Sequence, residues 1–546
     1  MTFKRFDPRK NFSTWLENFK NAVVQFGDEK AIIDPAQNKT WTYKEVDEIS
    51  NKLFHAFKNS GLRKNQVVMG AFRNCPEFVF TYVAARKAGS IFLAANASLA
   101  ATEMATLIDH NKPTILLYSA NITDVIVDAL KLCRQKPKLS VLSDNIECCR
   151  LPQSHIQFED YIKSHSSSPA APIRTKINRE VLRLCTSGTT SLPKTVPLTE
   201  LNEVYSCLDV ISNFNLKAGD ISLHMTPWFH RGGCHAVGIT PCLYTGACVI
   251  VLRTFCPKTT LELIEKYSVS FLIGAPANAK IISKQQKLNK KNLSSLKGLV
   301  TMGSALSRQD CLFCSENITH NIFNGYGTTE SFWNTILFPG DIQEHAGSSG
   351  RATKFDEVRI IYTGKKFPAS PDNTVQKDNV SEGEIIIRSP LKACTRYFRN
   401  HRESRKKFHN GWLYTGDIGT WDKDSFITVK GRIDDMMIVS GENIFPVQIE
   451  DAIETNPKVA ECIVTSVPDK VRGQAVAAYI VRKDNSLSIN EISDFCKNSK
   501  LLSRYKHPRY YAFVDSIPRT STGKKNHRQI KIQAEIDLAS GKLKKC

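Results

Sequence analysis

Residues 186–195 form a segment rich in groups that bind phosphate, Thr-Ser-Gly-Thr-Thr-Ser-Leu-Pro-Lys-Thr, which follows the apolar run 181–184. Hydroxyls and backbone N–H groups donate hydrogen bonds to phosphate oxygens, and a lysine adds positive charge. The spacing of glycine and lysine is not that of a Walker A loop. The segment predicts a polyanion-binding loop, with a solvated Ser/Thr-rich turn as the alternative. Its candidate ligand-binding residues are Thr186, Ser187, Gly188, Thr189, Thr190 and Lys194.

A second polar segment, residues 325–330, has the sequence Gly-Tyr-Gly-Thr-Thr-Glu and follows a predicted strand. Gly325 lets the backbone approach a flat ligand closely, and Tyr326 offers an aromatic face for stacking. Magnesium bound to phosphates usually takes one or two protein carboxylates, so Glu330 is a candidate ligand for Mg²⁺, with Thr329 supplying a hydroxyl beside it. The alternative is a glycine-rich turn before a helix.

Short apolar runs alternate with helical periodicity around this second segment. We expect strands at 269–274, 296–301 and 321–324, and a helix at 277–284. Strand, polar loop and helix in repetition predict an α/β fold with a parallel sheet. In such a sheet the ligand site lies at the carboxyl ends of the strands.

After about residue 358 the pattern changes to short alternating strands with turns, which predicts a small β-rich part over about 355–431. Beyond it we expect a helix at 446–455, two strands, a helix at 489–497 and a basic tail. The sequence therefore predicts a large N-terminal domain over 1–433, built of α/β subdomains and the β-rich part. A mobile α+β C-terminal domain over 434–546 would follow.

Three further motifs follow in this region. The first is Tyr414-Thr415-Gly416-Asp417, and the second, within residues 431–446, contains Gly-Arg-Ile-Asp-Asp and Ser-Gly-Glu-Asn-Ile-Phe-Pro. The third, residues 518–524, is Pro-Arg-Thr-Ser-Thr-Gly-Lys. Alone, each is also typical of an ordinary turn, strand–turn–helix or basic tail. Together with the two earlier segments, in this order, they resemble the adenylate-forming superfamily of acyl-CoA synthetases, adenylation domains of peptide synthetases and luciferase. The resemblance covers essentially the whole chain. Ser191 and Thr195 replace two glycines of the family's phosphate loop.

The resemblance implies a role for each matched residue. Tyr326 would lie against adenine, Thr329 on the α-phosphate and Glu330 on magnesium. Asp417 would accept the ribose hydroxyls, Arg432 would contact ribose or phosphate, and Asp434 would be the hinge. The loop Ser440, Gly441 and Glu442 would face CoA. Lys524 would be the catalytic lysine, with the adjacent Lys525 as a second candidate.

A substrate pocket is also implied by similarity, around His230 in the segment 227–233, the stretch 302–305 and the residues after Tyr326. Bulky side chains there favour an aromatic or a short-to-medium carboxylic acid, although each of them could instead belong to the core. The candidate pocket residues are Trp228, His230, Gly303, Ser304 and Trp333.

The predicted function is that of an ATP-dependent carboxylate–CoA ligase, which uses ATP and Mg²⁺ to form an acyl-AMP and then transfers the acyl group to CoA. Such an enzyme would belong to fatty or aromatic acid metabolism. One alternative is an acyl-adenylating enzyme that loads a carrier protein in trans. Another is a catalytically silent nucleotide-binding homologue.

Composition excludes a disordered, collagen-like or coiled-coil chain, because 41% of the 546 residues are apolar and 23% charged. The net charge of +21 favours anionic partners. No signal peptide or membrane-spanning segment is evident, so we expect a reduced cytoplasmic protein, with homo-oligomerisation left open. His230, Cys234 and His235 lack a second ligand pair, so we assign no transition metal. The basic run 396–409 could contact nucleic acid, but a solvated loop is favoured.

Overall fold

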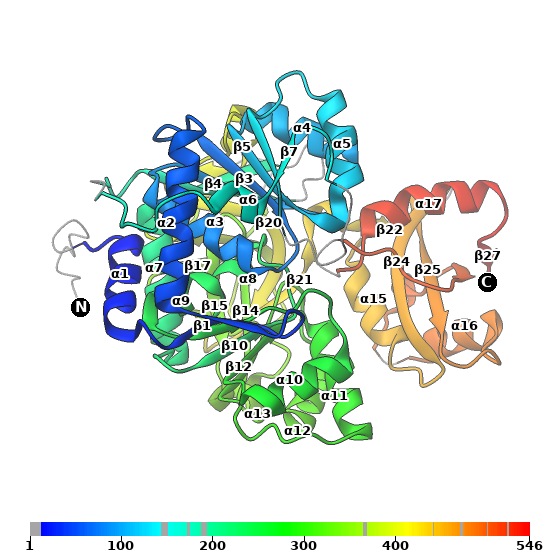
Figure 1. Ribbon diagram of the computed structural model, residues 1–546. Helices are drawn as coiled ribbons and strands as arrows, with labels where there is room; N and C mark the ends of the chain where they lie inside the picture. The colour runs from blue at the N-terminus through cyan, green and yellow to red at the C-terminus, as the bar shows by residue number, and fades with distance from the viewer. Residues whose placement is uncertain are drawn as a thin grey trace.

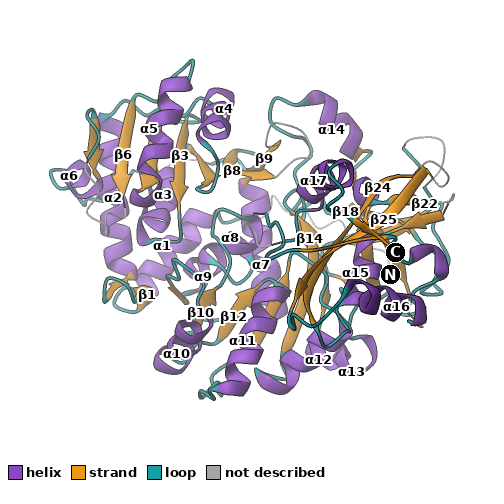
Figure 2. Ribbon diagram, turned by 90° about the vertical axis from the view of Figure 1, so that its right-hand side faces the viewer, coloured by secondary structure: helices purple, strands orange, loops and turns teal. Residues whose placement is uncertain are grey.

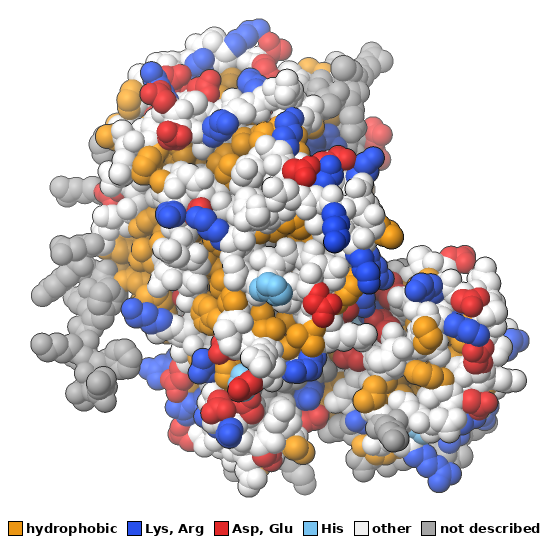
Figure 3. All heavy atoms as spheres, turned by 90° about the horizontal axis from the view of Figure 1, so that it is seen from below, with side chains coloured by type: hydrophobic (Ala, Val, Ile, Leu, Met, Phe, Trp, Pro, Cys, Tyr) orange, Lys and Arg blue, Asp and Glu red, His pale blue; other side chains and the backbone are white. Residues whose placement is uncertain are grey.

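The computed structural model describes residues 12–143, 151–171, 175–186, 194–363, 368–439, 442–469, 473–499, 501–520 and 524–546, with side chains omitted at 442 and 443. Two large sheets and a small sheet make up most of the molecule, and the C-terminal unit stands beside them (Figure 1). Viewed from below, this unit is a separate lobe with a hollow between it and the larger body (Figure 3).

The first large sheet is parallel except at one edge, where β8 and β9 form a hairpin. Its strands are apolar and mostly buried, as expected for a sheet covered on both faces. In spatial order they are β7 (His155–Gln157), β6 (Leu139–Ser143), β5 (Ile115–Ser119), β3 (Val67–Phe72), β4 (Ile91–Asn96), β8 (Glu180–Thr186) and β9 (Lys194–Thr199). The associated helices are α2 (Tyr43–Asn59), α3 (Pro76–Lys87), α4 (Ala101–Asn111), α5 (Thr123–Leu132) and α6 (Phe158–Ile162).

The second large sheet is parallel in its centre and antiparallel at both edges. Its strands, in order, are β16 (Arg351–Ala352), β15 (Phe332–Leu337), β14 (Ile322–Thr328), β13 (Gly298–Met302), β12 (Phe271–Gly274), β10 (Ile221–His224), β11 (Cys248–Ile250), β1 (Lys30–Asp34) and β2 (Lys39–Thr42). Its helices are α1 (Trp15–Phe26), α7 (Glu200–Phe214), α8 (Arg231–His235), α9 (Ile239–Thr245), α10 (Pro257–Tyr267), α11 (Pro276–Leu288), α12 (Arg308–Asn317) and α13 (Ile342–His345).

The small sheet is antiparallel and contains β17 (Glu357–Ile361), β18 (Gly383–Arg388), β20 (Trp412–Trp421), β19 (Phe408–His409) and β21 (Ile427–Arg432), with α14 (His401–Lys407) beside it. In the C-terminal unit, β22 (Met437–Val439) pairs with β23 (Glu442–Ile444), and a further sheet contains β24 (Val459–Asp469), β25 (Gly473–Arg482), β26 (Tyr510–Phe513) and β27 (Lys544–Lys545). The helices α15 (Pro446–Ile453), α16 (Ile489–Asn498) and α17 (His527–Ala539) pack on this sheet (Figure 2).

One hydrophobic core joins the two large sheets, and helices α1, α2, α3, α7 and α9 supply much of it. The carboxyl ends of the two sheets also meet. Asn74, just after β3, donates through its side chain to the Thr226 carbonyl at 3.1 Å and accepts the Trp228 N–H at 2.8 Å. Loops after the strands of both sheets are therefore held at one common edge.

The predicted α/β fold with a β-rich part and an α+β C-terminal unit is confirmed, as are the strands in the second large sheet at β12, β13 and β14. Two expectations are wrong. The alternative of a turn and helix after Tyr326 fails, because β14 runs on to Thr328 and returns as β15. The basic tail after α16 is not a tail, because it folds into β26, α17 and β27.

The helices within the described ranges include none that is both long and apolar enough to cross a lipid bilayer.

Candidate active site

Tyr326, Asp417 and Arg432 form a hydrogen-bonded cluster although they are distant in sequence. The Tyr326 hydroxyl donates to Oδ2 of Asp417 at 2.6 Å, and Nη1 of Arg432 donates to Oδ1 at 2.7 Å. Pairing of β20 with β21 sets Arg432 opposite Asp417, whereas Tyr326 comes from β14 of the second large sheet. Burial, and then the neighbouring Asp417, raise the pKa of Tyr326, so it stays a neutral donor. The result is an oriented carboxylate between an aromatic ring and a guanidinium.

Glu330 lies in the connection between β14 and β15 and is held from both ends. Its backbone carbonyl accepts the N–H of Cys394 at 2.8 Å, and its Oε1 accepts the hydroxyl of Tyr397 at 2.5 Å. Its other carboxylate oxygen accepts no hydrogen bond from the described residues. This leaves one anionic oxygen for a ligand.

Arg231, only 3% exposed, fixes the neighbouring backbone. Its Nη1 donates to the Thr329 carbonyl at 2.8 Å, and its Nη2 donates to the Lys392 carbonyl at 2.7 Å. Burial lowers the pKa of Arg231 to about 10, which leaves the guanidinium charged at neutral pH. Arg231 thus ties the loop after β10 to the connection that carries Thr329 and Glu330.

Lys194 opens β9 and pairs in register with Thr186, the last residue of β8. The predicted phosphate-loop residues between them, Ser187, Gly188, Thr189 and Thr190, lie outside the described residues. Lys194 Nζ lies 2.5 Å from Oε2 of Glu403 in α14 and 5.3 Å from the ring centre of Tyr397. The lysine that the sequence analysis assigned to phosphate is therefore paired with a carboxylate.

Lys524 reaches from the C-terminal unit to Gly303 at the end of β13. A Cβ built on Gly303, whose φ is +91°, would lie 3.4 Å from the Lys524 Cε and 3.9 Å from its Nζ. Lys524 is exposed to solvent, but the surrounding protein atoms partly desolvate its ammonium group and so lower its pKa. The negative charge of Asp417 opposes that shift. Burial, with a smaller contribution from Lys524, lowers the pKa of the nearby His230 to about 3.

The side chain of Lys525 points into its own C-terminal unit. Its Nζ lies 3.0 Å from Oε2 of Glu450 and 2.8 Å from Oε1 of Glu454, both within the C-terminal unit. Burial disfavours its charge, but Glu450, Cys462 and Glu454 together outweigh burial and raise the pKa of Lys525. Of the two adjacent lysines, only Lys524 faces the large body of the molecule.

The predicted pocket residues differ in their surroundings. Trp228 is fully buried and packs edge-on against Phe78 with ring centres 6.0 Å apart, so it is a core residue. Trp333 stacks on Phe332 at 5.1 Å, and its ring lies 3.1 Å from where a Cβ of Gly325 would stand. Ser304 is exposed beside Gly303.

The predicted hinge and thiol-side loop lie next to Arg432. Asp434 sits in the short 3₁₀ turn Ile433–Asp435, with a side chain 59% exposed and 3.8 Å from Arg432. Ser440 and Gly441 lie outside the described residues, and the side chain of Glu442 does as well. The backbone of Glu442 begins β23.

Three residues of this site were missed by sequence reasoning: Arg231, Tyr397 and Glu403. Tyr397 and Glu403 belong to the run 396–409, which was expected to be a solvated basic loop; part of it is instead helix α14 and β19. Their partners are 67 and 209 residues away, respectively. No local pattern marks such pairs.

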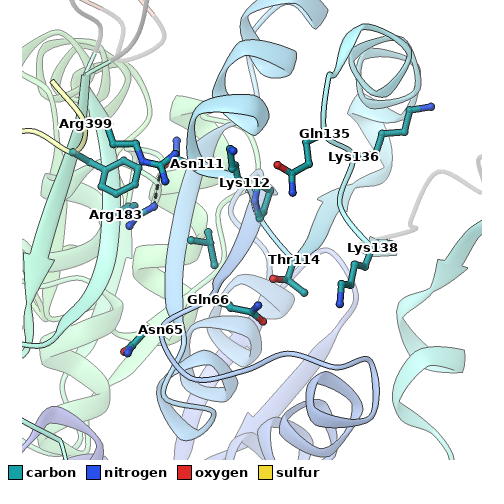
Figure 4. A pocket seen from close by; sticks show the side chains of 13 residues that line it. Asn65, Gln66, Asn111, Lys112, Thr114, Gln135, Lys136, Lys138, Arg183 and Arg399 are labelled. Carbon is teal, nitrogen blue, oxygen red and sulfur yellow. Dashed lines mark hydrogen bonds between the residues drawn. The ribbon is translucent and has the colours of Figure 1, made fainter.

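A cavity of about 400 Å³ lies away from this cluster, at the amino ends of β3, β5 and β6 (Figure 4). Its cationic lining residues are Lys112, Lys136, Lys138, Arg183 and Arg399. Lys112 caps the carboxyl end of α4, where a cation offsets the helix dipole, and Arg183 pairs with Glu180 at 2.6 Å. Lys136 points away from the others in Figure 4. Local structure thus accounts for the charges of Lys112 and Arg183.

Comparison with known families assigns the chain to a class. Residues 19–397 match the family model of the AMP-binding enzymes, and residues 448–524 match that of the AMP-binding enzyme C-terminal domain. The chain belongs to this family of adenylate-forming enzymes.

Among individual relatives, the chain is 27% identical over 500 residues to the long-chain-fatty-acid–CoA ligase FadD13 of Mycobacterium tuberculosis, covering 91% of this chain and 93% of the relative. It is 25% identical over 515 residues to the fatty acid–[acyl-carrier-protein] ligase ScoC of Streptomyces coeruleorubidus, covering 91% and 92%. The fold matches the crystal structure of the anthranilate CoA ligase AuaEII in complex with anthranoyl-AMP, with a TM-score of 0.85 at 23% identity over 97% of this chain and 98% of that one.

Proposed function

We propose that this protein is an ATP-dependent carboxylate–CoA ligase that forms an acyl-AMP and then an acyl thioester. The observation that carries the proposal is the convergence of the Asp417 cluster, Glu330 and Lys524 from three separate parts of the chain. A catalytically silent protein would have no need to bring a solvent-accessible lysine of one unit to a glycine of another.

In the proposed first step, a carboxylate oxygen of the acid attacks the α-phosphorus of ATP. The bond from that phosphorus to the bridging oxygen breaks, and pyrophosphate leaves. Two anions must approach each other, so charge neutralisation and alignment matter more than covalent help. Lys524 would stabilise the charge shared by the carboxylate and the α-phosphate, and Thr329 would donate to a phosphate oxygen.

The nucleotide would be held by the Asp417 cluster. A carboxylate can accept two hydrogen bonds from a cis-diol, and Asp417 is already oriented by Tyr326 and Arg432. The ring of Tyr326 would provide the stacking face for adenine.

Glu330 would hold Mg²⁺ through its unpaired oxygen. A single carboxylate with phosphate oxygens and water suits the octahedral preference of this ion, and the Tyr397 hydroxyl keeps the carboxylate oriented. When bound, the metal supplies charge neutralisation on the phosphates.

In the proposed second step, the thiol gives its proton to water and its sulfur attacks the acyl carbonyl carbon. The bond from that carbon to the phosphate oxygen breaks, and AMP leaves. Rotation about Asp434 would withdraw Lys524 and bring the Ser440–Gly441–Glu442 loop to the thiol. The basic residues of the C-terminal unit suit a thiol that carries a nucleotide, such as CoA.

For the acid, we propose an aromatic or a short-to-medium substrate. Trp333 and Phe332 are stacked next to Gly325, so the space beyond the nucleotide site is bounded by aromatic rings. His230, neutral because of its lowered pKa, would face the acid as an uncharged imidazole.

A carrier-protein thiol is the second candidate acceptor, because ScoC, a relative of similar identity, is named as an acyl-carrier-protein ligase. Formation of AMP that depends on CoA, without any carrier protein present, would favour CoA. If a carrier protein is required instead, the acceptor part of the proposal is wrong while adenylation stands.

The test of adenylation is carboxylate-dependent exchange of pyrophosphate into ATP, measured over a panel of aromatic, short, medium and long acids. We expect exchange with at least one acid, and pyrophosphate release that rises when CoA is added. No exchange with any acid would favour the catalytically silent alternative.

A further inference from the structure

A single segment, residues 394–407, contacts both Glu330 and Lys194, the two side chains that we assign to the magnesium and phosphate part of the site. Tyr397 in this segment donates to Glu330, and Glu403 pairs with Lys194. The segment is anchored to β9, because the Phe398 N–H donates to the Thr195 carbonyl at 2.9 Å. The guanidinium of Arg183 lies 3.5 Å from the ring centre of Phe398. The positions of Tyr397 and Glu403 therefore follow from the packing of β8 and β9.

The pair of Lys194 and Glu403 is shielded from water. The two side chains are 10% and 14% exposed, and Nζ lies 2.5 Å from Oε2. The hydrogen bond from Lys194, with a second from Lys406, lowers the pKa of Glu403 to about 2, so the carboxylate is charged at any pH of interest. A shielded pair of opposite charges interacts more strongly than an exposed one.

We infer that Glu403 is an internal counter-anion that the triphosphate of ATP must displace from Lys194. The inference rests on the proposed function, because it takes Lys194 to be a phosphate-binding group. A carboxylate and a phosphate oxygen are both anionic acceptors, and they compete for the same ammonium group. Glu403 therefore limits the affinity of the free enzyme for ATP and for pyrophosphate.

Glu403 has a second cationic partner that remains when Lys194 leaves it. Its other oxygen, Oε1, lies 2.9 Å from Nζ of Lys406, one turn further along α14, and that lysine is 55% exposed. When Lys194 moves to phosphate, Lys406 remains as a partner. Without such a second cation, the departure of Lys194 would leave a desolvated carboxylate unpaired, which is costly.

Two substitutions are therefore expected to act in opposite directions. Glu403→Gln keeps the size of the side chain but removes the competing charge, so the dissociation constants for ATP and pyrophosphate should fall about tenfold, equal to about 1.4 kcal/mol. Lys406→Gln removes the alternative partner, so Glu403 holds Lys194 more firmly and ATP should bind several-fold more weakly.

The experiment is isothermal titration of the full-length protein with ATP and, separately, with pyrophosphate. Glu344→Gln is the matched control, because Glu344 is 85% exposed and the formal charge change is the same. A double variant with Lys194→Gln completes the cycle: once Lys194 is gone, Glu403→Gln should have no effect on binding.

The inference is overturned if Glu403→Gln binds ATP as the wild type does or more weakly, which would make Glu403 a group that positions Lys194. It is also overturned if Glu344→Gln tightens binding equally, because a general charge effect would then suffice. If the wild-type protein binds neither ATP nor pyrophosphate, the proposed function fails first. Binding by the wild type without tightening in the variant refutes the inference alone.

Discussion

The two ends of the proposed nucleotide site differ in the charge of the partners that hold their charged groups. At the ribose end, Asp417 is held by Tyr326 and Arg432, which are a neutral donor and a cation. At the phosphate end, Lys194 is held by Glu403, an anion. In both places a charged side chain is fixed by an internal hydrogen bond.

The consequence for ligand binding is opposite. In the proposed site a ribose diol would donate to Asp417, as Tyr326 and Arg432 do, and the carboxylate has lone pairs for further donors. The existing bonds therefore orient Asp417 without blocking it. By our inference, a phosphate would instead have to replace Glu403 on Lys194. An internal hydrogen bond thus preorganises a site when the group it holds keeps free capacity for the ligand, and opposes binding when the ligand has to take the place of the internal partner.

The largest expected effect is at Lys524, which extends from the C-terminal unit toward Gly303 and is close enough to Asp417 to feel its charge. Lys524→Ala should slow acyl-AMP formation by about a hundred- to a thousandfold, because it removes a charge aimed at the transition state. Thioester formation from supplied acyl-AMP should be spared. Pyrophosphate exchange and thioester formation, measured separately, check this.

The neighbouring lysine is the control for that experiment. Lys525→Ala removes a cation from Glu450 and Glu454, so it should lower the melting temperature while leaving exchange far less affected than Lys524→Ala does. Equal loss of both half-reactions in Lys524→Ala would contradict the two-state scheme.

The next effect tests the preorganised end. Asp417→Asn should raise the KM for ATP about ten- to a hundredfold, because a hydrogen bond to a charged group contributes about 1.5–3 kcal/mol. The KM for the acid should change little. Asp424→Asn, an exposed acid in the turn between β20 and β21, is the control. An unchanged response to ATP would remove Asp417 from the ribose site.

A pH profile sharpens the role of Lys524. Desolvation lowers the pKa of Lys524 below its ordinary 10.5, so the ammonium is present below the lowered pKa and is lost as the pH rises through it, earlier than for an ordinary lysine. Adenylation should therefore fall in alkaline solution by about tenfold per pH unit above that pKa. Lys524→Arg, whose guanidinium keeps its charge, should lose this alkaline limb. A limb that persists in the arginine variant would assign it to another group.

The smallest effect concerns the metal. Tyr397→Phe deletes the hydroxyl that orients Glu330, so the Mg²⁺ concentration for half-maximal exchange should rise about fivefold, as for one ordinary hydrogen bond. Tyr414→Phe removes a hydroxyl that donates to the Ala369 carbonyl in the small sheet, and it should leave the Mg²⁺ response unchanged. Equal responses of the two variants would argue against a metal role for Glu330.

Much of the fold was predictable because it rests on local patterns. The apolar runs that became β12, β13 and β14 lie between polar loops and helical repeats, and this alternation predicts a parallel sheet. The end of the chain was misjudged because its many lysines and arginines hid the apolar positions of β26 and α17. Those few positions, among them Tyr511 and Ile530, are buried against β25 and its neighbours.

For the site as well, some features were predictable from the sequence and others were not. Residue types and their order along the chain were enough to identify the superfamily and to nominate Tyr326, Glu330, Asp417 and Arg432. They favoured Lys524 as the catalytic lysine but kept the adjacent Lys525 as a second candidate. Only the structure separates the two, since Glu450 and Glu454 pair with Lys525 while Lys524 extends toward Gly303.

By itself, the sequence determined which chemical groups this protein has and the class of enzyme to which it belongs, because short motifs carry their residue types and spacing wherever they fold. Only the tertiary structure decided which charged and polar side chains lie next to one another. Glu403 meets Lys194 across 209 positions, and Tyr397 meets Glu330 across 67. Such contacts depend on the packing of whole sheets, and no local pattern encodes the sign of a partner that arrives from elsewhere in the chain.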